Sequence, residues 1–494
     1  MDFLDPNKKR AHKRKLFIGY ILMAIAIGLG AIVLLYAAYG YGVDRQGNVF
    51  QNGLVFVAST PDAAEVSIKS ADGQRSQKAI TSERLVLPAG TYNFEFLKQG
   101  YKPWQRTIEL RGGDVQRLVY PFLFPETFRP SDVTRYDELP GFVTVSPDRS
   151  TILVQRPENM LNFEVINANN PEESAETFAL PRSLLSSGRN RTLNLAEWST
   201  NNRHLLVKHT FDKKTEYILI DRANPNESIN INKHFNLNPK RVLFRDKNPD
   251  QLYIQQPNNQ LLTADVSERS TDEILKSALD FQPHGDNMLL YVASGNGVPK
   301  GKVGVYIFTD QQSYKLREIP TSPTYLLDLA QHNNSWLVAA GASSDNRVYV
   351  YRNPITFIKA NNPKATMSIR TMRITNPTSI SFSANAQFIA VQSGQSFDVY
   401  DAQEDRQYHF TINTPFDKNS GPAKWMDGHR LLTSTGGKVT VFDFDGSNYQ
   451  LLTAATPGYT PMFDRDYTRM YSIAPSQSTR GKLALVQTPL RIEQ

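Results

Sequence analysis

A short pattern recurs eight times between residues 145 and 473 and limits what the chain can fold into. An apolar or aromatic anchor residue precedes a polar turn, an apolar strand follows, and a second strand often ends in Asp, as in "VSPDRSTILV" and "FSANAQFIAV". The anchors are Val145, Trp198, Phe244, Phe281, Leu329, Phe382, Trp425 and Phe463, at intervals of 53, 46, 37, 48, 53, 43 and 38 residues. A repeat of this length is one supersecondary unit, which must stack on its neighbours to bury its apolar face.

This spacing predicts a β-propeller over residues 125–494. A four-stranded blade needs roughly 40–50 residues, and period-two strands such as "EYILID" and "VTVFDF" follow several anchors. Eight anchors predict eight blades, or seven if the first or last unit is split to close the ring. The aromatic anchors are expected on inner strands or between blades. The polar turn resembles the Trp/Phe-Ser-Pro-Asp-Gly turn of WD-like and TolB-type propellers, although the Gly-His and Trp-Asp signature of WD repeats is missing.

The other strong feature is an apolar run from Leu16 to Ala38, 23 residues without a charge. A helix of this length spans a hydrocarbon core of roughly 30 Å at about 1.5 Å per residue. The alternative is a cleaved signal peptide, since Ala38 and Gly40 are small residues at suitable spacing. We favour an uncleaved signal-anchor because the apolar part of a signal peptide is typically only about 7–15 residues long.

The flanks of this run predict its orientation. Residues 1–15 hold six basic and two acidic groups, a net charge of +4, and the other 479 residues have 49 basic and 46 acidic groups, or only +3. The positive-inside rule places the basic tail in the cytoplasm and the domains after residue 40 outside. The nearly balanced body gives no footprint for nucleic acid. The small-residue pairs Ala24/Gly28 and Ala26/Gly30 leave helix pairing open, and the oligomeric state is unknown.

Residues 40–52 are predicted as a linker, and residues 53–124 as a small antiparallel β-sandwich. Short alternating strands there are broken by Gly and Pro turns, and Gly90 and Gly100 are expected to supply positive φ. The segments Ser59–Val66, Pro88–Tyr92 and Gly100–Tyr101 resemble the PEGA domain, which implies a β-sandwich common in prokaryotic envelope proteins and no catalytic residues. Tyr101 and Trp104 suggest sugar stacking, but we expect them to pack the sandwich.

No catalytic, cofactor-binding or metal-binding residues are predicted. The chain has no cysteine, which excludes disulfides and a Cys nucleophile. Its histidines, at 12, 204, 209, 234, 284, 332, 409 and 429, show no zinc-binding pair spacing. "DFDG" at 443–446 lacks the rest of a calcium loop, and the glycine-rich segments 295–302 and 436–440 lack the P-loop spacing, so both kinds are expected to be turns.

Together these features predict an all-β, single-pass envelope protein, and the family resemblance implies that it is bacterial. Residues 1–15 are a cytoplasmic tail, 16–38 contact membrane lipid, and the PEGA-like sandwich carries an extracytoplasmic propeller. We expect a binding or scaffold protein for an envelope protein or a cell-wall or surface-layer polymer, with no enzymatic activity and no cofactor. The alternative is a glycan-active enzyme, a propeller lyase or glycosidase, which would need carboxylates or a metal converging at the channel.

Overall fold

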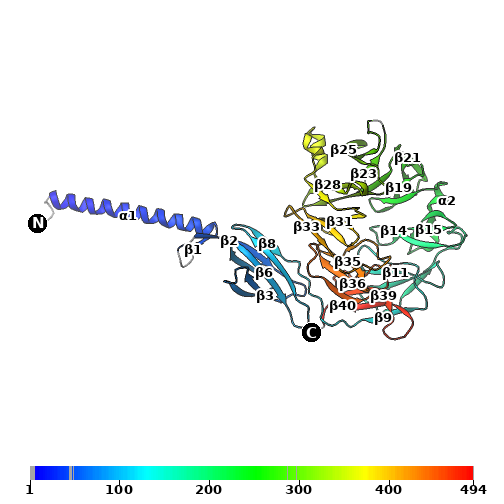
Figure 1. Ribbon diagram of the computed structural model, residues 1–494, viewed down its shortest axis with the longest axis horizontal. Helices are drawn as coiled ribbons and strands as arrows, with labels where there is room; N and C mark the ends of the chain where they lie inside the picture. Colours follow the sequence, from blue (N-terminus) through cyan, green and yellow to red (C-terminus); the bar gives the residue numbers. More distant parts are fainter. Residues whose placement is uncertain (1–5, 44–46, 48, 286, 296, 493–494) are drawn as a thin grey trace. The chain divides into compact units, whose positions relative to one another are not determined.

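The chain divides into two compact units, Met1–Thr127 and Phe128–Gln494 (Figure 1). The computed structural model describes residues 6–43, 47, 49–285, 287–295 and 297–492. The first unit contains a long helix and a small sandwich of β-strands. The regular elements of the second unit are almost all strands, so the all-β class predicted for the domains is confirmed.

Helix α1 (Pro6–Ala38) contains the whole predicted membrane span and begins ten residues before it. Its segment Lys9–Ala38 is long and apolar enough to cross a membrane, and none of its most apolar window is buried against the protein. These properties fit a membrane anchor or a signal sequence. Because the helix starts at Pro6, the basic residues of the tail from Lys9 to Lys15 extend the same helix beyond the apolar run.

The sandwich in the first unit consists of two four-stranded sheets. One sheet has the order β1-β2-β5, with β8 pairing in parallel with β2, and the other has the order β4-β3-β6-β7. The strands are β1 (Tyr41–Val43), β2 (Val49–Val57), β3 (Glu65–Ser70), β4 (Ser76–Ile80), β5 (Glu83–Pro88), β6 (Gly90–Leu97), β7 (Trp104–Leu110) and β8 (Val115–Leu118). The stretch 40–52, predicted as a linker, instead holds β1 and the start of β2.

The core of the sandwich explains its aromatic residues. Trp104 is only 1% exposed, and its ring meets those of Phe96 and Tyr120 edge-on at 5.2 and 5.6 Å. Tyr101 is also buried, so both rings pack the sandwich, as expected, and neither is available to stack on a sugar. Gly100 has a positive φ of 81° at its turn, but Gly90 does not, because it already begins the extended strand β6.

The described part of the second unit forms eight four-stranded sheets, each built mainly from consecutive strands. The first four are β10 (Val143–Val145), β11 (Thr151–Gln155), β12 (Asn162–Asn167), β13 (Glu176–Ala179); β14 (Thr192–Trp198), β15 (His204–Phe211), β16 (Lys214–Asp221), β17 (Ile229–Asn230); β18 (Arg241–Arg245), β19 (Asn248–Gln255), β20 (Leu261–Asp265), β21 (Ser270–Leu275); and β22 (Asp280–His284), β23 (Met288–Ala293), β24 (Lys302–Thr309), β25 (Gln312–Pro320). The next three are β26 (Tyr325–His332), β27 (Ser335–Ala342), β28 (Arg347–Arg352), β29 (Arg370–Arg373); β30 (Ser379–Phe382), β31 (Phe388–Ser393), β32 (Ser396–Asp401), β33 (Arg406–Thr411); and β34 (Lys424–Trp425), β35 (Arg430–Thr435), β36 (Lys438–Asp443), β37 (Gln450–Ala454). Short helices α2 (Ile231–Phe235) and α3 (Pro354–Lys359) lie between strands.

The eighth sheet joins the two ends of the unit. It contains β38 (Met462–Phe463), β39 (Arg469–Pro475), β40 (Leu483–Pro489) and, as its fourth strand, β9 (Ser131–Tyr136) from the start of the unit. The first strands of neighbouring sheets contact one another, as β14 with β18, β26 with β30, and β10 with β38. Sheets that meet through their first strands and close on themselves through β9 form a β-propeller, with the first strands innermost.

The sequence anchors lie where the repeat predicted, in the first strand of each sheet. Four of the six aromatic anchors are buried: Phe244 and Phe281 are 1% exposed, Phe463 is 5% and Trp198 is 8%. Phe382 and Trp425 are half-buried. The polar turn after the anchor is closed by its own side chains, since the Ser146 hydroxyl and the Asp148 carboxylate accept the backbone N–H groups of Thr151 and Ser150.

Candidate functional site

The residue immediately before the anchor links neighbouring sheets around the centre of the propeller. Backbone N–H groups of Phe244 and Phe382 donate to Glu197 (2.7 Å) and Asp328 (3.1 Å), each on the preceding sheet in the chain. The indoles of the tryptophan anchors donate to this position on the preceding sheet as well, Trp198 to Thr144 and Trp425 to Ser381, both at 3.0 Å. These bonds fix the inner strands and thereby the walls of the space that they surround.

Burial raises the pKa of one of these carboxyl groups, Asp328, to about 6, although the N–H groups of Leu329 and Phe382 bind and lower it. Both carboxylate oxygens are therefore committed to backbone donors. This makes Asp328 a structural link between sheets rather than a base that could take a proton from a substrate.

A cavity of about 560 Å³ opens where the inner strands of four neighbouring sheets begin. Its lining residues are Asn194, Leu195, Ala196, Lys208, Tyr217, Lys240, Arg241, Val242, Leu243, Gln255, Leu279, Asp280, Pro323, Thr324 and Tyr325. They come from β14–β16, from β18, β19 and β22, and from β26 with the loop before it. We call this the inner-strand cavity. Its volume lies within the range of roughly 300–1,000 Å³ that is typical of ligand-binding pockets.

The charges in the inner-strand cavity are mainly positive. Arg241 is paired with Asp280 at 2.9 Å, and its guanidinium lies 5.0 Å from the ring of Phe281. Lys240 donates to Asn259 Oδ1 and to the Leu279 carbonyl, at 3.2 and 3.4 Å. Lys208 is half-buried, and within the described residues its ammonium has neither a hydrogen bond nor an ion pair. The lining therefore has three cations and one carboxylate, and one of its cations is unpaired.

This arrangement is suited to binding. Glycosidases use a pair of carboxyl groups that flank the scissile bond, about 5–10 Å apart. The lining holds one carboxylate, Asp280, which is already paired with Arg241. The cations, the amides of Asn194 and Gln255 and the hydroxyl of Tyr325 can hold an acidic or polar group. They offer no nucleophile with an adjacent base.

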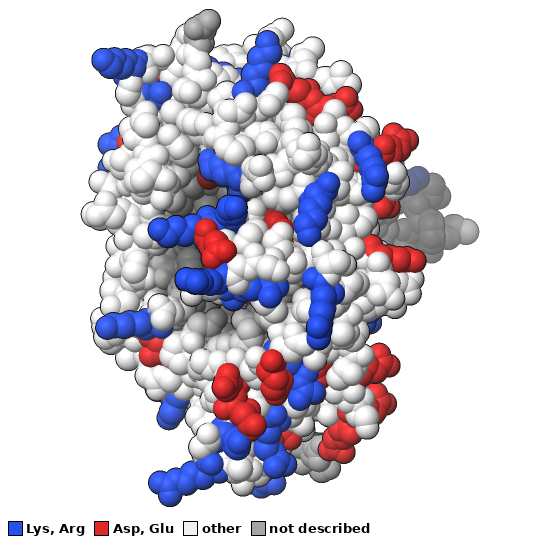
Figure 2. Space-filling view, turned by 90° about the vertical axis from the view of Figure 1, so that its right-hand side faces the viewer, with Lys and Arg blue, Asp and Glu red and all other residues white. Residues whose placement is uncertain are grey.

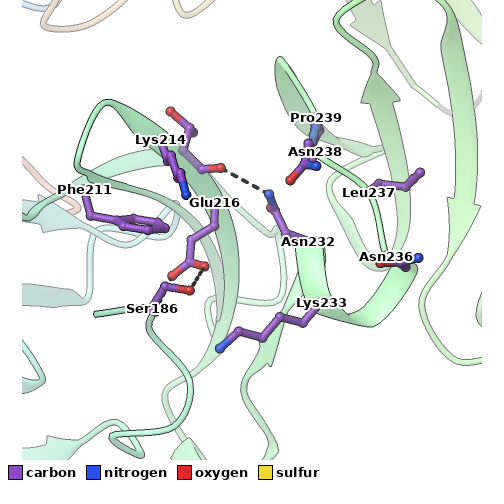
Figure 3. Close-up of a pocket in the computed structure, with 11 residues that line it drawn as sticks. Ser186, Phe211, Lys214, Glu216, Asn232, Lys233, Asn236, Leu237, Asn238 and Pro239 are labelled. Carbon is purple, nitrogen blue, oxygen red and sulfur yellow. Dashed lines mark hydrogen bonds between the residues drawn. The ribbon is translucent and has the colours of Figure 1, made fainter. Parts of the chain in front are cut away.

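A second cavity, of about 580 Å³, lies beside helix α2 (Figure 3). Figure 3 shows Ser186 facing Glu216, whose carboxylate accepts the Ser186 hydroxyl and backbone N–H, both at 2.7 Å. Glu216 also bonds to His209 at 2.8 Å. The side chain of Asn232 in α2 accepts the N–H of Tyr217 and donates to the carbonyl of Thr215, and so continues the pairing along the edge of β16 beyond the short strand β17.

Ser186 and Glu216 of this second cavity do not form a catalytic triad with the neighbouring His209. Ser186 donates to Glu216 rather than to the histidine, and the side chain of His209 is fully buried. Burial, together with the nearby Arg191, lowers the pKa of His209, although Glu216 raises it. Burial raises the pKa of Glu216, but its hydrogen bonds lower the pKa by more, so the pKa of Glu216 lies below the usual value. His209 therefore links the Glu216 carboxylate to Arg191, and the bonds of Glu216 to Ser186 hold the loop that carries Ser186.

Lys and Arg side chains are numerous on the face that Figure 2 shows, the side on which Figure 1 places α2 and β15. Several of them surround a hollow, and many of the Asp and Glu side chains lie nearer the edges of this face. Basic side chains therefore gather around the hollow on this face.

The motifs that the sequence predicts to be turns are turns in the structure. "DFDG" ends β36, where the side chain of Asn448 donates to Asp443 and Gly446 has a φ of 81°. Gly436 and Gly437 join β35 to β36, and Gly295 and residues 297–301 lie between β23 and β24. Within the described residues, no group of three or more His, Asp or Glu side chains is placed to hold a metal ion.

The comparisons with known proteins concern the fold alone. No family model and no curated protein match the chain, so the PEGA resemblance has no support from them. Among solved structures, the chain is similar to the Dos1 propeller (13% identity, 74% of this chain and 96% of that one, TM-score 0.47). It is also similar to Porphyromonas gingivalis dipeptidyl peptidase 4 (11% identity, 72% and 58%, TM-score 0.45). Because these TM-scores are below 0.5, the propeller assignment depends on the strand order of the chain itself.

Sequence reasoning did not identify Lys208, Lys240 or Arg241. Lys208 lies in an alternating strand, where a lysine is usually a solvent-facing residue. The sequence does contain one signal for Lys240 and Arg241, which is their position relative to the anchor Phe244. Lys240 comes directly before β18 and Arg241 is its first residue, so both lie where the inner strand that carries Phe244 begins.

Proposed function

We propose that this chain is a membrane-anchored binding scaffold, with α1 in a membrane and the propeller as the recognition domain on the extracytoplasmic side. The inner-strand cavity carries the proposal, because its walls come from four sheets and it contains the unpaired ammonium of Lys208. A rigid propeller that gathers loops and strand ends at one opening is well suited to display binding residues.

The membrane part of the proposal is supported by α1. Its basic N-terminal turns precede the apolar run, which favours a cytoplasmic N-terminus. In the chain, only the small sandwich, PEGA-like in its turns, separates α1 from the propeller, which supports a partner close to the membrane. The partner is therefore an envelope protein or a polymer of the inner cell wall or surface layer.

The charge of the inner-strand cavity indicates which kind of group on the partner would bind there. Lys208, Lys240 and Arg241 against Asp280 leave two positive charges in excess. A partner that places an acidic group at the cavity mouth would compensate them. Opposed potentials of this kind guide encounter and select the partner.

Protease treatment tests the topology. In intact cells stripped of their wall, added protease is expected to digest the sandwich and propeller and to spare the N-terminal tail, because only residues after α1 lie outside. An epitope at each end of the chain reports the result on immunoblots. A propeller that is protected in intact cells and digested only after lysis would contradict the proposed orientation.

Crosslinking tests the cavity. The chain has no natural cysteine, so Asn194→Cys with a thiol-reactive benzophenone places one photocrosslinker at the cavity. We expect discrete envelope adducts, and Lys208→Glu should weaken binding of the partner by at least about tenfold, since breaking a buried charge contact costs about 2–5 kcal/mol.

The control for this experiment is Arg465→Glu, which makes the same charge change at an exposed site on the turn between β38 and β39. Equal adduct yields in the Lys208 and Arg465 variants would rule out the cavity as the binding site. Turnover of an envelope glycan that is lost in Asp280→Asn would support the glycan-active enzyme instead.

A further inference from the structure

The end of α1 is joined to the sandwich by a short, hydrogen-bonded connection. The backbone N–H of Asn52 in β2 donates to the Gly40 carbonyl at 2.8 Å, and the Gln51 side chain donates to the Tyr39 carbonyl at 3.2 Å. The rings of Tyr36 in the last turns of α1 and Tyr41 in β1 lie 5.2 Å apart. The hairpin formed by β1 and β2 is therefore fixed to the end of the helix.

This β1–β2 hairpin exposes large apolar side chains. Tyr39 and Val43 are each 67% exposed, Val49 is 63% and Tyr41 is 39%. Val43 pairs with Val49 and Tyr41 with Gln51, so these side chains share one face of the hairpin, because alternate residues of a strand point the same way. Its turn residues 44–46 and 48 lie outside the described residues.

The opposite face of the hairpin is partly covered, since Gly42 and Phe50 are half-buried. Phe50 lies over Gly42, where an added Cβ would come within 2.8 Å of the Phe50 ring, and the guanidinium of Arg75 lies 5.9 Å from the same ring. The hairpin is thus partly covered on its Phe50 face and more exposed on its Tyr41–Val43–Val49 face. We call the more exposed face, together with Tyr39, the hairpin patch.

The length of the connection decides what can cover the hairpin patch. Val43 lies five residues after Ala38, so it is within about 18 Å of the helix end at the limit of roughly 3.6 Å per residue. The headgroup region on each side of a bilayer is several ångströms thick, and tyrosine is enriched there because its ring is apolar and its hydroxyl is polar. Tyr36, Tyr39 and Tyr41 occur together at this end of the span.

We propose that the hairpin patch lies in the lipid headgroup region, where it holds the sandwich against the bilayer. The inference rests on the proposed membrane anchor, since it is α1 that brings the patch to the lipid. The hairpin patch would then be a second contact with lipid, beyond α1 itself, and would restrict how the sandwich tilts relative to the helix.

Environment-sensitive fluorescence on single-cysteine variants of the full chain tests this proposal. The chain in vesicles of phosphatidylcholine and phosphatidylglycerol would carry a nitrobenzoxadiazole label at Val43→Cys or Val49→Cys. Leu35→Cys in α1 is the reference for lipid, and Val86→Cys on β5, a valine that is 53% exposed, is the reference for water. We expect the hairpin labels to emit at shorter wavelength than Val86 and to be quenched by spin-labelled lipid, as the Leu35 label is.

Two different failures can be separated in this experiment. In the first, spin-labelled lipid quenches the Leu35 label while the hairpin labels match the Val86 label in both emission wavelength and lack of quenching. In that case the membrane anchor is correct and the hairpin proposal is wrong. If the Leu35 label also behaves like Val86 and the protein does not float with vesicles, the membrane anchor itself fails. A third outcome would also overturn the proposal. If spin-labelled lipid does not affect the hairpin labels, but their fluorescence changes when the protein is diluted, a second copy of the chain covers the patch.

Discussion

Replacing Phe244 by Ala is expected to lower the free energy of unfolding by about 3–5 kcal/mol, the cost of removing a large aromatic ring from a packed core. Phe244 is 1% exposed and packs in a cluster with Tyr217 and Leu219 of one sheet and Ile254 of the next. Its ring therefore fills the junction between two sheets. Urea unfolding of the full chain in detergent, followed by circular dichroism, measures the loss.

Leu451→Ala is the control for this prediction. Leu451 is a strand residue of the same propeller, but it is 39% exposed, so its truncation leaves little cavity and should cost less than about 1 kcal/mol. Similar losses in the two variants would contradict the packing of Phe244 between sheets.

The position of Phe244 was predictable because a large aromatic residue at a regular interval is a strong signal. All eight anchors, aromatic or aliphatic, lie on first strands, and a single substitution elsewhere in the repeat would not have hidden them. The polar residues before the anchors were not predictable in the same way. Glu197 and Asp328 look like ordinary charged strand residues, and their partners, Phe244 and Phe382, are 47 and 54 residues away in the sequence.

The boundary between helix and sandwich was misread for a related reason. Residues 40–52 contain Gly, Asp, Asn and Gln, a composition typical of a linker. The strand character of Tyr41–Val43 and of residues 49–52 depends on their pairing with one another and with β5, as Asn52 pairs with Pro88. A short strand of three residues, such as β1, has no periodicity that the sequence alone could reveal.

The inner-strand cavity shows where sequence reasoning reaches its limit. Lys208 and Arg241 are 33 positions apart and belong to different sheets, and only the ring geometry places them at one opening. The sequence has no motif that distinguishes the lysine at the opening from the many other lysines of the chain.

The closure of the ring gives the second large effect. Asp132 in β9 accepts hydrogen bonds from the loop between β39 and β40, from the Ser476 hydroxyl (2.6 Å), the Gln477 N–H (2.8 Å) and the hydroxyl and N–H of Ser478 (2.5 and 3.3 Å). These bonds join residues more than 340 positions apart. Asp132→Ala is expected to cost about 3 kcal/mol at neutral pH, since one hydrogen bond to a charged group contributes about 1.5–3 kcal/mol and such bonds do not add fully.

The effect of Asp132 should depend on pH in a definite direction. Burial alone would raise its pKa, but the hydrogen bonds from Ser476, Ser478 and Gln477 outweigh it and lower the pKa from 3.8 to about 2. A lowered pKa means that the folded state binds the proton less well than the unfolded state. The stabilisation is therefore present above the unfolded pKa of 3.8 and is lost as the pH falls through about 2.

Urea unfolding between neutral pH and about pH 2.5 measures this dependence, because the difference between the native chain and Asp132→Ala should shrink as Asp132 becomes protonated. Asp137→Ala is the matched control, since Asp137 lies one residue after β9 and its carboxylate is 76% exposed in an ion pair with Lys482. An exposed pair contributes roughly 0–1 kcal/mol, so this variant should change little at any pH. The difference in free energy of unfolding between the native chain and Asp132→Ala could instead stay constant down to low pH. That result would contradict the proposal that the charged Asp132 carboxylate holds the first and last strands together. The ring would then be closed by the pairing of β9 with β40 alone.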